Sequence, residues 1–136
     1  MKLIIDTNIL YSYFWRNTIT KRLIIQEDFE LYAPEFALEE IKKYKADIIK
    51  KTKITEDEFK VSKFDLAISI KFIPIEDYKK YLKQALEISP DPNDIDFLAL
   101  AMKLNLPLWS NDLKLKKQNK VQILNTKEIL TLLDKQ

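Results

Sequence analysis

The sequence predicts an α/β fold in which a central, mainly parallel sheet of about five strands is covered by helices on both faces. Short apolar runs alternate from end to end with segments of helical periodicity, which is the pattern of such sheets. The 136 residues are the length of one ordinary domain, so we expect residues 1–136 to form a single domain. Hydrophobic residues make up 46% of the chain and charged residues 32%, which is typical of a globular protein.

The first half of the chain contains two expected strands. The apolar run at residues 3–5 turns polar at Asp6, and the apolar, aromatic segment 9–15 follows, which fits a buried strand leading into a helix. Residues 31–32 form a minimal second strand. Pro34 then opens a helix at its favoured first position. That helix keeps an apolar stripe at steps of three and four residues, at Ala37, Ile41, Tyr44 and Ile48.

The middle of the chain adds a helix, a strand and a second helix. Thr55 and Glu58 have capping-box spacing and begin a helix that runs to about residue 70. The third strand spans residues 72–75, and Pro74 within it favours an edge position. Residues 76–88 are expected to be helical.

The last third repeats this alternation. A helix over residues 93–104 ends at Asn105, which is the best available left-handed cap in a chain without Gly. Residues 106–109 and 121–124 form the fourth and fifth strands, and Thr126 caps the final helix.

The residue types missing from the sequence narrow the chemistry. Without Cys or His there is no disulfide, thiolate nucleophile, Ser-His-Asp triad or imidazole metal site. Without Gly there is no Walker loop or dinucleotide fingerprint. Carboxylates, hydroxyls and lysines remain for catalysis, and the net charge of +2 indicates little about a partner. The sequence has no signal-like leader and no run of membrane-spanning length, so we expect a cytoplasmic protein with no membrane partner.

Three aspartates occupy equivalent positions. Asp6 follows the first strand, Asp112 follows the fourth, and Asp94 opens a helix. Because ligands bind at the carboxyl ends of parallel strands, Asp6 and Asp112 are expected along one edge of the sheet. Taken alone, each aspartate is as consistent with a simple helix cap. Their joint placement favours a shared site.

A fourth acid comes from the helix after Pro34. On a helical wheel Glu39 faces Lys42 and Lys43, which describes a solvated surface. Glu40 lies instead on the flank of the buried stripe, where a carboxylate is costly unless it is paired or bound to a cation. We therefore choose Glu40 as the site residue.

Four gathered carboxylates need a counter-charge. Hard oxygen donors select a hard cation, so the expected cofactor is Mg²⁺ or Mn²⁺, which can activate water against a phosphodiester. Four polar residues flank the acids and are expected either to orient ligands and water or to serve only as turn and cap residues. They are Thr7, Asn8, Ser110 and Asn111.

The sequence resembles the PIN domains, a family that includes the VapC-type toxins of toxin–antitoxin pairs. Four segments carry the resemblance, in the family's order and across nearly the whole chain: Leu-Ile-Ile-Asp-Thr-Asn at 3–8, residues 34–41, Asp-Pro-Asn-Asp-Ile-Asp at the start of 91–101, and Leu-Pro-Leu-Trp-Ser-Asn-Asp at 106–112. Two positions depart from the family pattern. Lys114 stands where another acid is common, and Ser110 stands where Thr is commoner.

The resemblance implies a three-layer α/β/α PIN-like sandwich and a metal-dependent ribonuclease. Its acids are carried over onto Asp6, Glu40, Asp94 and Asp112, with Asp96 as an auxiliary metal ligand or a mere helix-start charge. The helical pair over residues 34–70 resembles the hairpin that such proteins use for contacts with an antitoxin or with a second copy in a homodimer.

We expect an endoribonuclease that is the toxin of a toxin–antitoxin pair. The alternatives are a general RNA-processing nuclease, a non-catalytic nucleic-acid or protein-binding module, and a receiver-like phospho-acceptor domain. A receiver would need an acid pair directly after the first strand, which the sequence lacks. RNA phosphates have two lysine clusters available, unless these are ordinary solvated surface: residues 42, 43 and 45, and residues 114, 116, 117 and 120. The aromatic residues at 11 and 13–15 are expected mostly in the core, with one exposed ring available to stack on a base.

Overall fold

In the computed structural model, which describes residues 1–16, 18–26 and 28–135, five strands form one parallel sheet in the order β3-β2-β1-β4-β5. The strands are β1 (Lys2–Ile5), β2 (Glu30–Pro34), β3 (Ile70–Ile73), β4 (Leu108–Trp109) and β5 (Ile123–Leu124). This confirms the predicted α/β fold with a parallel five-stranded sheet. Because β1 lies in the centre, its carboxyl end is flanked by the ends of β2 and β4.

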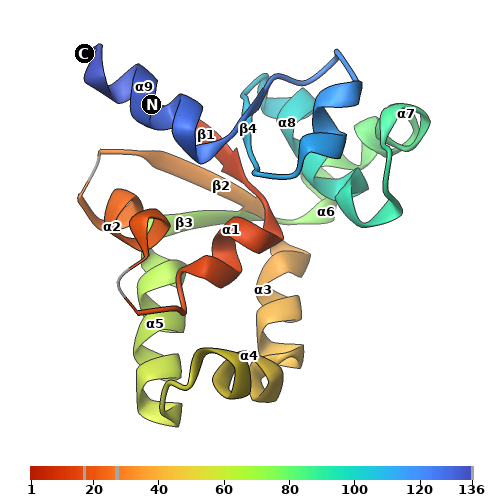
Figure 1. Ribbon diagram of the computed structural model, residues 1–136. Helices are drawn as coiled ribbons and strands as arrows, with labels where there is room; N and C mark the ends of the chain where they lie inside the picture. Colours follow the sequence, from red (N-terminus) through yellow and green to blue (C-terminus); the bar gives the residue numbers. More distant parts are fainter. Residues whose placement is uncertain (17, 27, 136) are drawn as a thin grey trace.

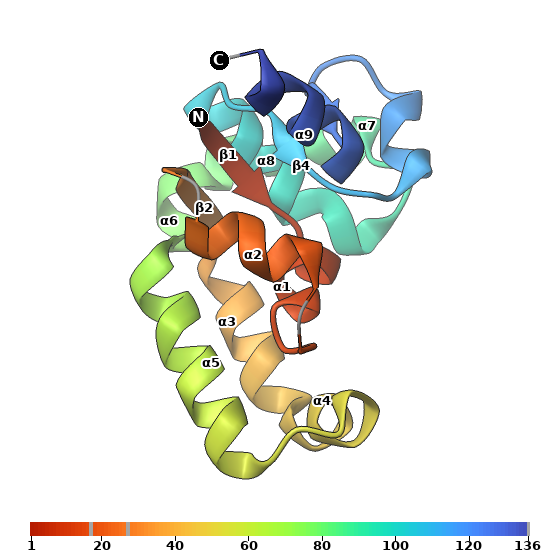
Figure 2. The same ribbon diagram turned by 60° about the vertical axis from the view of Figure 1, so that its left-hand side comes forward.

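Helices cover both faces of the sheet. Figures 1 and 2 show α1 (Thr7–Ser12), α2 (Ile19–Gln26) and α9 (Thr126–Asp134) on one face, and α7 (Leu82–Ile88) and α8 (Ile95–Leu104) on the other. Three further helices project away from the sheet: α3 (Glu35–Lys43), α4 (Lys45–Thr52) and α5 (Glu56–Ser69). We call these three helices, residues 35–69, the helical arm. Short segments complete the chain: α6 (Ile75–Tyr78), and the 3₁₀ turns η1 (Lys79–Tyr81), η2 (Pro92–Asp94) and η3 (Leu113–Lys117).

The core lies where β1 meets α8. Leu3, Ile4 and Ile5 are fully buried, as expected for a strand covered on both faces. In α8 the five consecutive residues 97–101 are all buried, because this helix packs across β1, β2 and β4. Among the described residues, no helix is both long enough and apolar enough to cross a lipid bilayer.

The helix expected from Pro34 onward differs from the prediction in two ways. Pro34 is the last residue of β2, with φ −62° and ψ 143°, and the helix begins one residue later at Glu35. The periodic stripe also continues across a bend at Tyr44, whose φ of −98° and ψ of 20° separate α3 from α4. Two helical hydrogen bonds span the bend, from Tyr44 N–H to the Glu40 carbonyl and from Ile48 N–H to the Tyr44 carbonyl. The spacing of the apolar residues is therefore the same on both sides of it.

Pro74 also has a different role from the predicted one. It ends β3 and caps α6, so Ile75 belongs to a helix and not to the strand. The edge position of β3 is confirmed. The helix predicted over residues 76–88 is wrong as a single unit, because the 3₁₀ turn η1 divides it into α6 and α7.

Cap residues account for most of the remaining boundaries. The Thr55–Glu58 capping box is confirmed, and Asn105 adopts the predicted left-handed conformation with φ 54°. The last helix is capped by Asn125, whose side chain accepts from Glu128 N–H, and not by Thr126 as predicted. Helix α2 was not predicted, because Thr18, Thr20 and the charged residues around them interrupt its apolar pattern.

Candidate active site

The register of the sheet builds the centre of the site. Ile5 of β1 pairs with Trp109 of β4, so the next residues along the two strands, Asp6 and Ser110, lie side by side at the carboxyl edge. The Asp6 N–H donates to the Trp109 carbonyl at 3.2 Å. Asp112 follows two residues later, and its N–H donates to Ser110 Oγ at 3.1 Å. Asp6 and Asp112 therefore share one edge of the sheet, as the sequence predicts.

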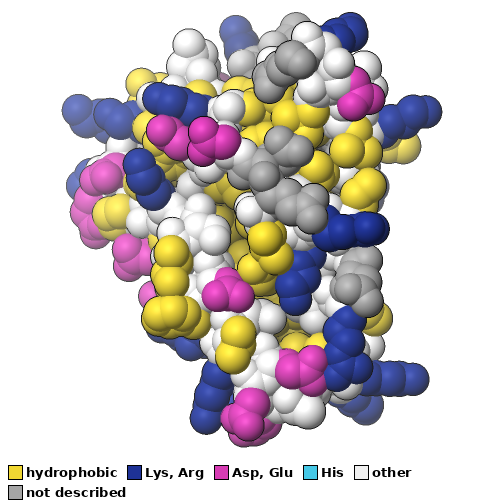
Figure 3. Space-filling view, turned by 90° about the vertical axis from the view of Figure 1, so that its left-hand side faces the viewer, with side chains coloured by type: hydrophobic (Ala, Val, Ile, Leu, Met, Phe, Trp, Pro, Cys, Tyr) yellow, Lys and Arg dark blue, Asp and Glu magenta, His cyan; other side chains and the backbone are white. Residues whose placement is uncertain are grey.

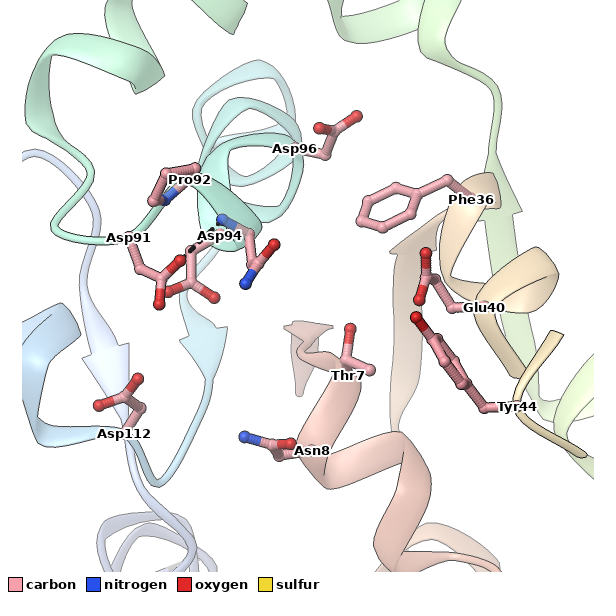
Figure 4. Close-up of a pocket in the computed structure, with 11 residues that line it drawn as sticks. Thr7, Asn8, Phe36, Glu40, Tyr44, Asp91, Pro92, Asp94, Asp96 and Asp112 are labelled. Carbon is pink, nitrogen blue, oxygen red and sulfur yellow. Dashed lines mark hydrogen bonds between the residues drawn. The ribbon is translucent and has the colours of Figure 1, made fainter. Parts of the chain in front are cut away.

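An acidic pocket of about 450 Å³ opens at this edge. Its lining comes from segments far apart in the chain, and Figure 4 shows Asp91, Asp94 and Asp112 on one side of the pocket and Glu40 on the other. The lining residues are Thr7 and Asn8 of α1, Phe36, Glu40 and Tyr44 of the arm, residues 91–94 with Asp96, and Asp112. We refer to it as the acidic pocket.

Asp6 lies beneath this pocket and is nearly buried. Its side chain is 4% exposed, and burial raises its pKa from 3.8 to about 6, although hydrogen bonds from Ser110 and the Ile9 N–H oppose the shift. The nearby charge of Asp112 raises the pKa further. A carboxylate in this environment is destabilised at neutral pH unless a cation neutralises it.

Asp94 has the same electrostatic character. Its pKa rises to about 6, first because of burial and then because of the negative charges of Asp91, Asp6 and Asp112. The raised pKa values place Asp6, Asp94 and Asp112 within one electrostatic cluster. Clusters of this kind are enriched at functional sites.

Helix capping explains part of this arrangement. Asp6 accepts from Ile9 N–H at 2.9 Å and Asp112 accepts from Lys114 N–H at 3.0 Å, so both are helix caps. Asp112 also lines the acidic pocket, whereas Asp6 is buried next to it and is not one of the lining residues. Asp94 differs from them. The described hydrogen bonds include none from its side chain to the first turn of α8, and Asp91 caps this region instead through Asn93 N–H at 2.9 Å. Capping alone therefore does not account for Asp94.

Across the pocket stands Glu40. It is half-buried and lines the acidic pocket, whereas Glu39 is exposed to solvent. Tyr44, one turn further along, points toward the same side of the pocket, as Figure 4 shows. Phe36, one turn before Glu40, also lines the pocket and packs edge-on against Phe97 with ring centroids 5.6 Å apart, which anchors the start of α3 to α8.

The other predicted residues fall into two groups. Thr7, Asn8 and Asp96 line the acidic pocket, and Ser110 is buried beside Asp6. Asp96 accepts a 2.6 Å hydrogen bond from the hydroxyl of buried Tyr78, which orients its carboxylate. Asn111 lies outside this group. Its side-chain oxygen accepts from the N–H and hydroxyl of Thr126 at 2.8 and 3.1 Å, which ties the end of β4 to α9.

Sequence reasoning missed Asp91 and Tyr44. Asp91 lines the pocket and raises the pKa of Asp94. Its position between Pro90 and Pro92, directly before a helix that begins with acids, was the available signal. Tyr44 belonged to the predicted apolar stripe by its spacing, and in the structure it lies one helical turn beyond Glu40 and lines the pocket with it.

The donor set suits a hard divalent cation. The acidic side chains that line the pocket are all carboxylates, and a positive charge there would lower the raised pKa values of Asp94 in the lining and of the buried Asp6 next to it. As they stand, no three acidic side chains in the described part of the chain are close enough together to hold one ion. Mg²⁺ keeps several water ligands and needs only one or two direct carboxylates, so the pocket still fits it.

Comparison with known proteins gives the family. The chain matches the PIN domain family over residues 4–134, nearly its whole length. This chain is a PIN domain. No curated protein sequence matches it.

Among solved structures, the PIN domain is similar to a chain in the crystal structure of VapBC2 from Rickettsia felis bound to a DNA fragment from their promoter. The TM-score is 0.59 at 18% identity, and the match covers 92% of this chain and 98% of that one. This likeness supports the fold alone. It confirms that the three-layer PIN-like arrangement predicted from the sequence is the architecture of this chain.

Proposed function

We propose that this PIN domain is a metal-dependent endoribonuclease and the toxin of a toxin–antitoxin pair. The observation that carries the proposal is the buried Asp6 carboxylate, held at the central strand end and coupled electrostatically to Asp94 and Asp112. Several carboxylates placed near one another in a partly buried site lower the stability of the fold. A bound divalent cation would neutralise their charge and use them as ligands.

The residues of the pocket have separate roles in this proposal. Asp6, Asp94 and Asp112 would hold Mg²⁺ or Mn²⁺, with Glu40 and Asp96 completing the set from the other side, directly or through water. The ion supplies, when bound, charge stabilisation at the phosphodiester and activation of water. Ser110 and the Ile9 N–H fix the Asp6 carboxylate by hydrogen bonds, and Tyr78 fixes Asp96. Thr7 and Asn8 border the acids and are suited to orient substrate or water.

RNA affinity would come from the lysines near the pocket. Lys43 lies over the Tyr44 ring, with its Nζ 5.4 Å from the ring centroid. Lys114 and Lys117 are exposed on η3, which directly follows Asp112. Lys116 pairs with Glu128 and Lys45 with Glu56, so these two are less available to phosphate. Such contacts give salt-dependent, sequence-independent affinity.

Two observations support an antitoxin or a second copy as partner. The similar structure is that of a two-protein complex. In addition, the arm exposes Val61, Phe64 and Ile68 along one side of α5, each more than 60% exposed. Figure 3 shows hydrophobic side chains on the face that carries α2 and α5. Exposed apolar patches of this kind mark protein contacts. Light scattering of the chain alone, and after coexpression with the adjacent reading frame, tests both partners.

RNA cleavage tests the enzymatic proposal. Cleavage of a labelled single-stranded RNA should require Mg²⁺ or Mn²⁺ and stop in EDTA. Asp6→Asn and Asp94→Asn should each lower the rate about a hundredfold or more, because a neutral amide is a far poorer ligand for a hard cation. Glu39→Gln is the control and should cleave at the wild-type rate. Full cleavage by both aspartate variants would leave a non-catalytic binding module as the better explanation.

A further inference from the structure

A second cavity, lined largely by aromatic rings, adjoins the acidic pocket. This groove of about 340 Å³ lies between the end of α1 and α4, and it is mostly apolar. Its lining residues are Tyr11, Trp15, Tyr44, Asp47, Ile48, Lys51 and Thr52. Tyr44 belongs to both cavities, so the aromatic groove and the acidic pocket form one continuous surface. Figure 2 shows α4 at the far end of the helical arm, below α1 in the view.

The aromatic residues around α1 divide into a buried pair and a groove pair. Tyr13 and Phe14 are each 1% exposed, and Phe14 stacks on Phe59 with centroids 5.0 Å apart. Trp15, the next residue, is 45% exposed, and Tyr11 lines the groove with it. The core therefore uses only half of this aromatic segment. The other half, Tyr11 and Trp15, lines the groove, and Tyr11 lies close enough to Glu40 that burial and then the Glu40 charge raise the Tyr11 pKa.

The charges at the groove fit a nucleotide. Lys51 lines the groove, and the Nζ of Lys43 lies 5.4 Å from the centroid of the Tyr44 ring, which lines both cavities. These two cations can therefore contact the phosphates of a nucleic acid that occupies the groove. Asp47 adds a carboxylate that can accept from the N–H groups of a base. Stacking rings flanked by cations are the elements with which proteins hold single-stranded nucleic acid.

We propose that the aromatic groove binds one unpaired base of the RNA, stacked on Trp15, while the neighbouring phosphate lies in the acidic pocket. The inference rests on the proposed ribonuclease function, because it assigns the groove to the same substrate. An RNA chain with one phosphate in the acidic pocket must continue on either side, and the groove is continuous with that pocket through Tyr44. The substrate class is therefore single-stranded RNA with an accessible base next to the cleaved bond.

Intrinsic fluorescence gives a direct readout. The chain has two tryptophans, and Trp109 is fully buried while Trp15 is exposed. In EDTA, where no cleavage interferes, a short single-stranded oligoadenylate should quench the Trp15 emission. An abasic ribose-phosphate chain of equal length and charge should not. Trp15→Phe retains only Trp109 and should lose the quenching but keep most of the affinity, since Phe still stacks.

Truncation of the ring measures its contribution. Trp15→Ala should weaken oligonucleotide binding about tenfold, from the loss of one base–aromatic stack. With Mg²⁺ present, Trp15→Ala should raise KM by a similar factor and leave kcat nearly unchanged. The reason is that the groove contacts a base of the substrate and not the phosphodiester that reacts. Phe64→Ala is the matched control, because Phe64 is 66% exposed on α5, outside the groove. It should change neither value.

The outcomes separate this inference from the proposed function. Cleavage of RNA without Trp15 quenching, or equal quenching by the abasic chain, would overturn the base-binding groove and leave the ribonuclease standing. Quenching without cleavage would retain the groove and remove the enzyme. If Trp15→Ala keeps its RNA affinity but loses a protein partner encoded beside the gene, the groove is a protein-docking site and the nucleotide assignment is wrong.

Discussion

The pKa values of carboxylates shift in opposite directions in the acidic pocket and at the helical arm. In the pocket, burial and neighbouring acids raise the pKa values of Asp6 and Asp94 to about 6. At the arm, Glu58 accepts two hydrogen bonds from Arg16 and one from Thr55 N–H, which lower its pKa to about 2. The same chemical group is thus strained in one region and stabilised in the other.

This contrast distinguishes carboxylates whose charge stabilises the folded state from carboxylates whose charge destabilises it. Glu58 joins α5 to the segment after α1 and completes the capping box of α5. Its charge favours the folded state. Asp6 opposes folding when ionised and has no cationic partner among the described ion pairs. Buried carboxylates of that kind are enriched at functional sites, which supports the role proposed for Asp6.

The largest expected effect is on the pH dependence of folding stability, measured in EDTA. It tests whether the buried Asp6 carboxylate destabilises the folded protein. Because its pKa is higher in the folded state (about 6) than in the unfolded state (3.8), the folded protein binds more protons between these values. Wild-type stability should therefore fall as the pH rises from about 3 to 7, by about 3 kcal/mol from this group. Asp6→Asn, which retains a capping oxygen, should lose this part of the fall, keep the part due to Asp94, and be more stable than the wild type at pH 7.

Added metal should remove most of the stability difference between these two proteins. At a hundred times its dissociation constant, Mg²⁺ should stabilise the wild type by about 2.7 kcal/mol, and Asp6→Asn should lose most of that gain. Thermal melts at matched ionic strength measure both effects, with Glu39→Gln as the control that behaves like wild type. Identical pH and metal responses in wild type and Asp6→Asn would reduce Asp6 to a helix cap.

A smaller effect is expected from two neighbouring glutamates of α3. One of them lines the acidic pocket and the other belongs to the exposed side of the helical arm. Glu40→Gln should lower kcat/KM for RNA about ten- to a hundredfold, the range for residues that support a metal site. Glu39→Gln, one residue away on the exposed side, should stay within about twofold of wild type. Both substitutions keep the size and helix propensity of the side chain. The opposite order would mean that the site uses the other face of α3.

The smallest effect concerns the arm. Glu58→Gln preserves the capping-box hydrogen bonds but removes the charge that pairs with Arg16. Because the pair is exposed, the melting temperature should fall by a few degrees at most, and high salt should abolish the difference. The sign of the pH response is opposite to that of Asp6, since this stabilisation is present above pH 4.5 and lost as the pH falls toward 2. A large loss at neutral pH would contradict the contrast.

Local sequence determined the parts of this protein that depend on neighbours along the chain. The Thr55–Glu58 box, the left-handed Asn105 and the turn from strand to helix at Asp6 are all fixed within a few residues. The face of α3 on which Glu40 lies also follows from helical periodicity. These features were predictable because their hydrogen bonds and packing periods are short-range.

Features that combine residues from distant parts of the sequence depended on the tertiary structure. The pocket combines residues from α1, the arm, η2 and the loop after β4, and the raised pKa of Asp94 depends on Asp91, Asp6 and Asp112 together. The inclusion of Asp91 in the pocket and the formation of the aromatic groove depend on how α1, the helical arm and the segment before α8 come together in the folded chain. A periodic pattern identifies which face of an element is buried but not which element covers it. Burial and electrostatic neighbours, the causes of the site's chemistry, therefore existed only once the chain had folded.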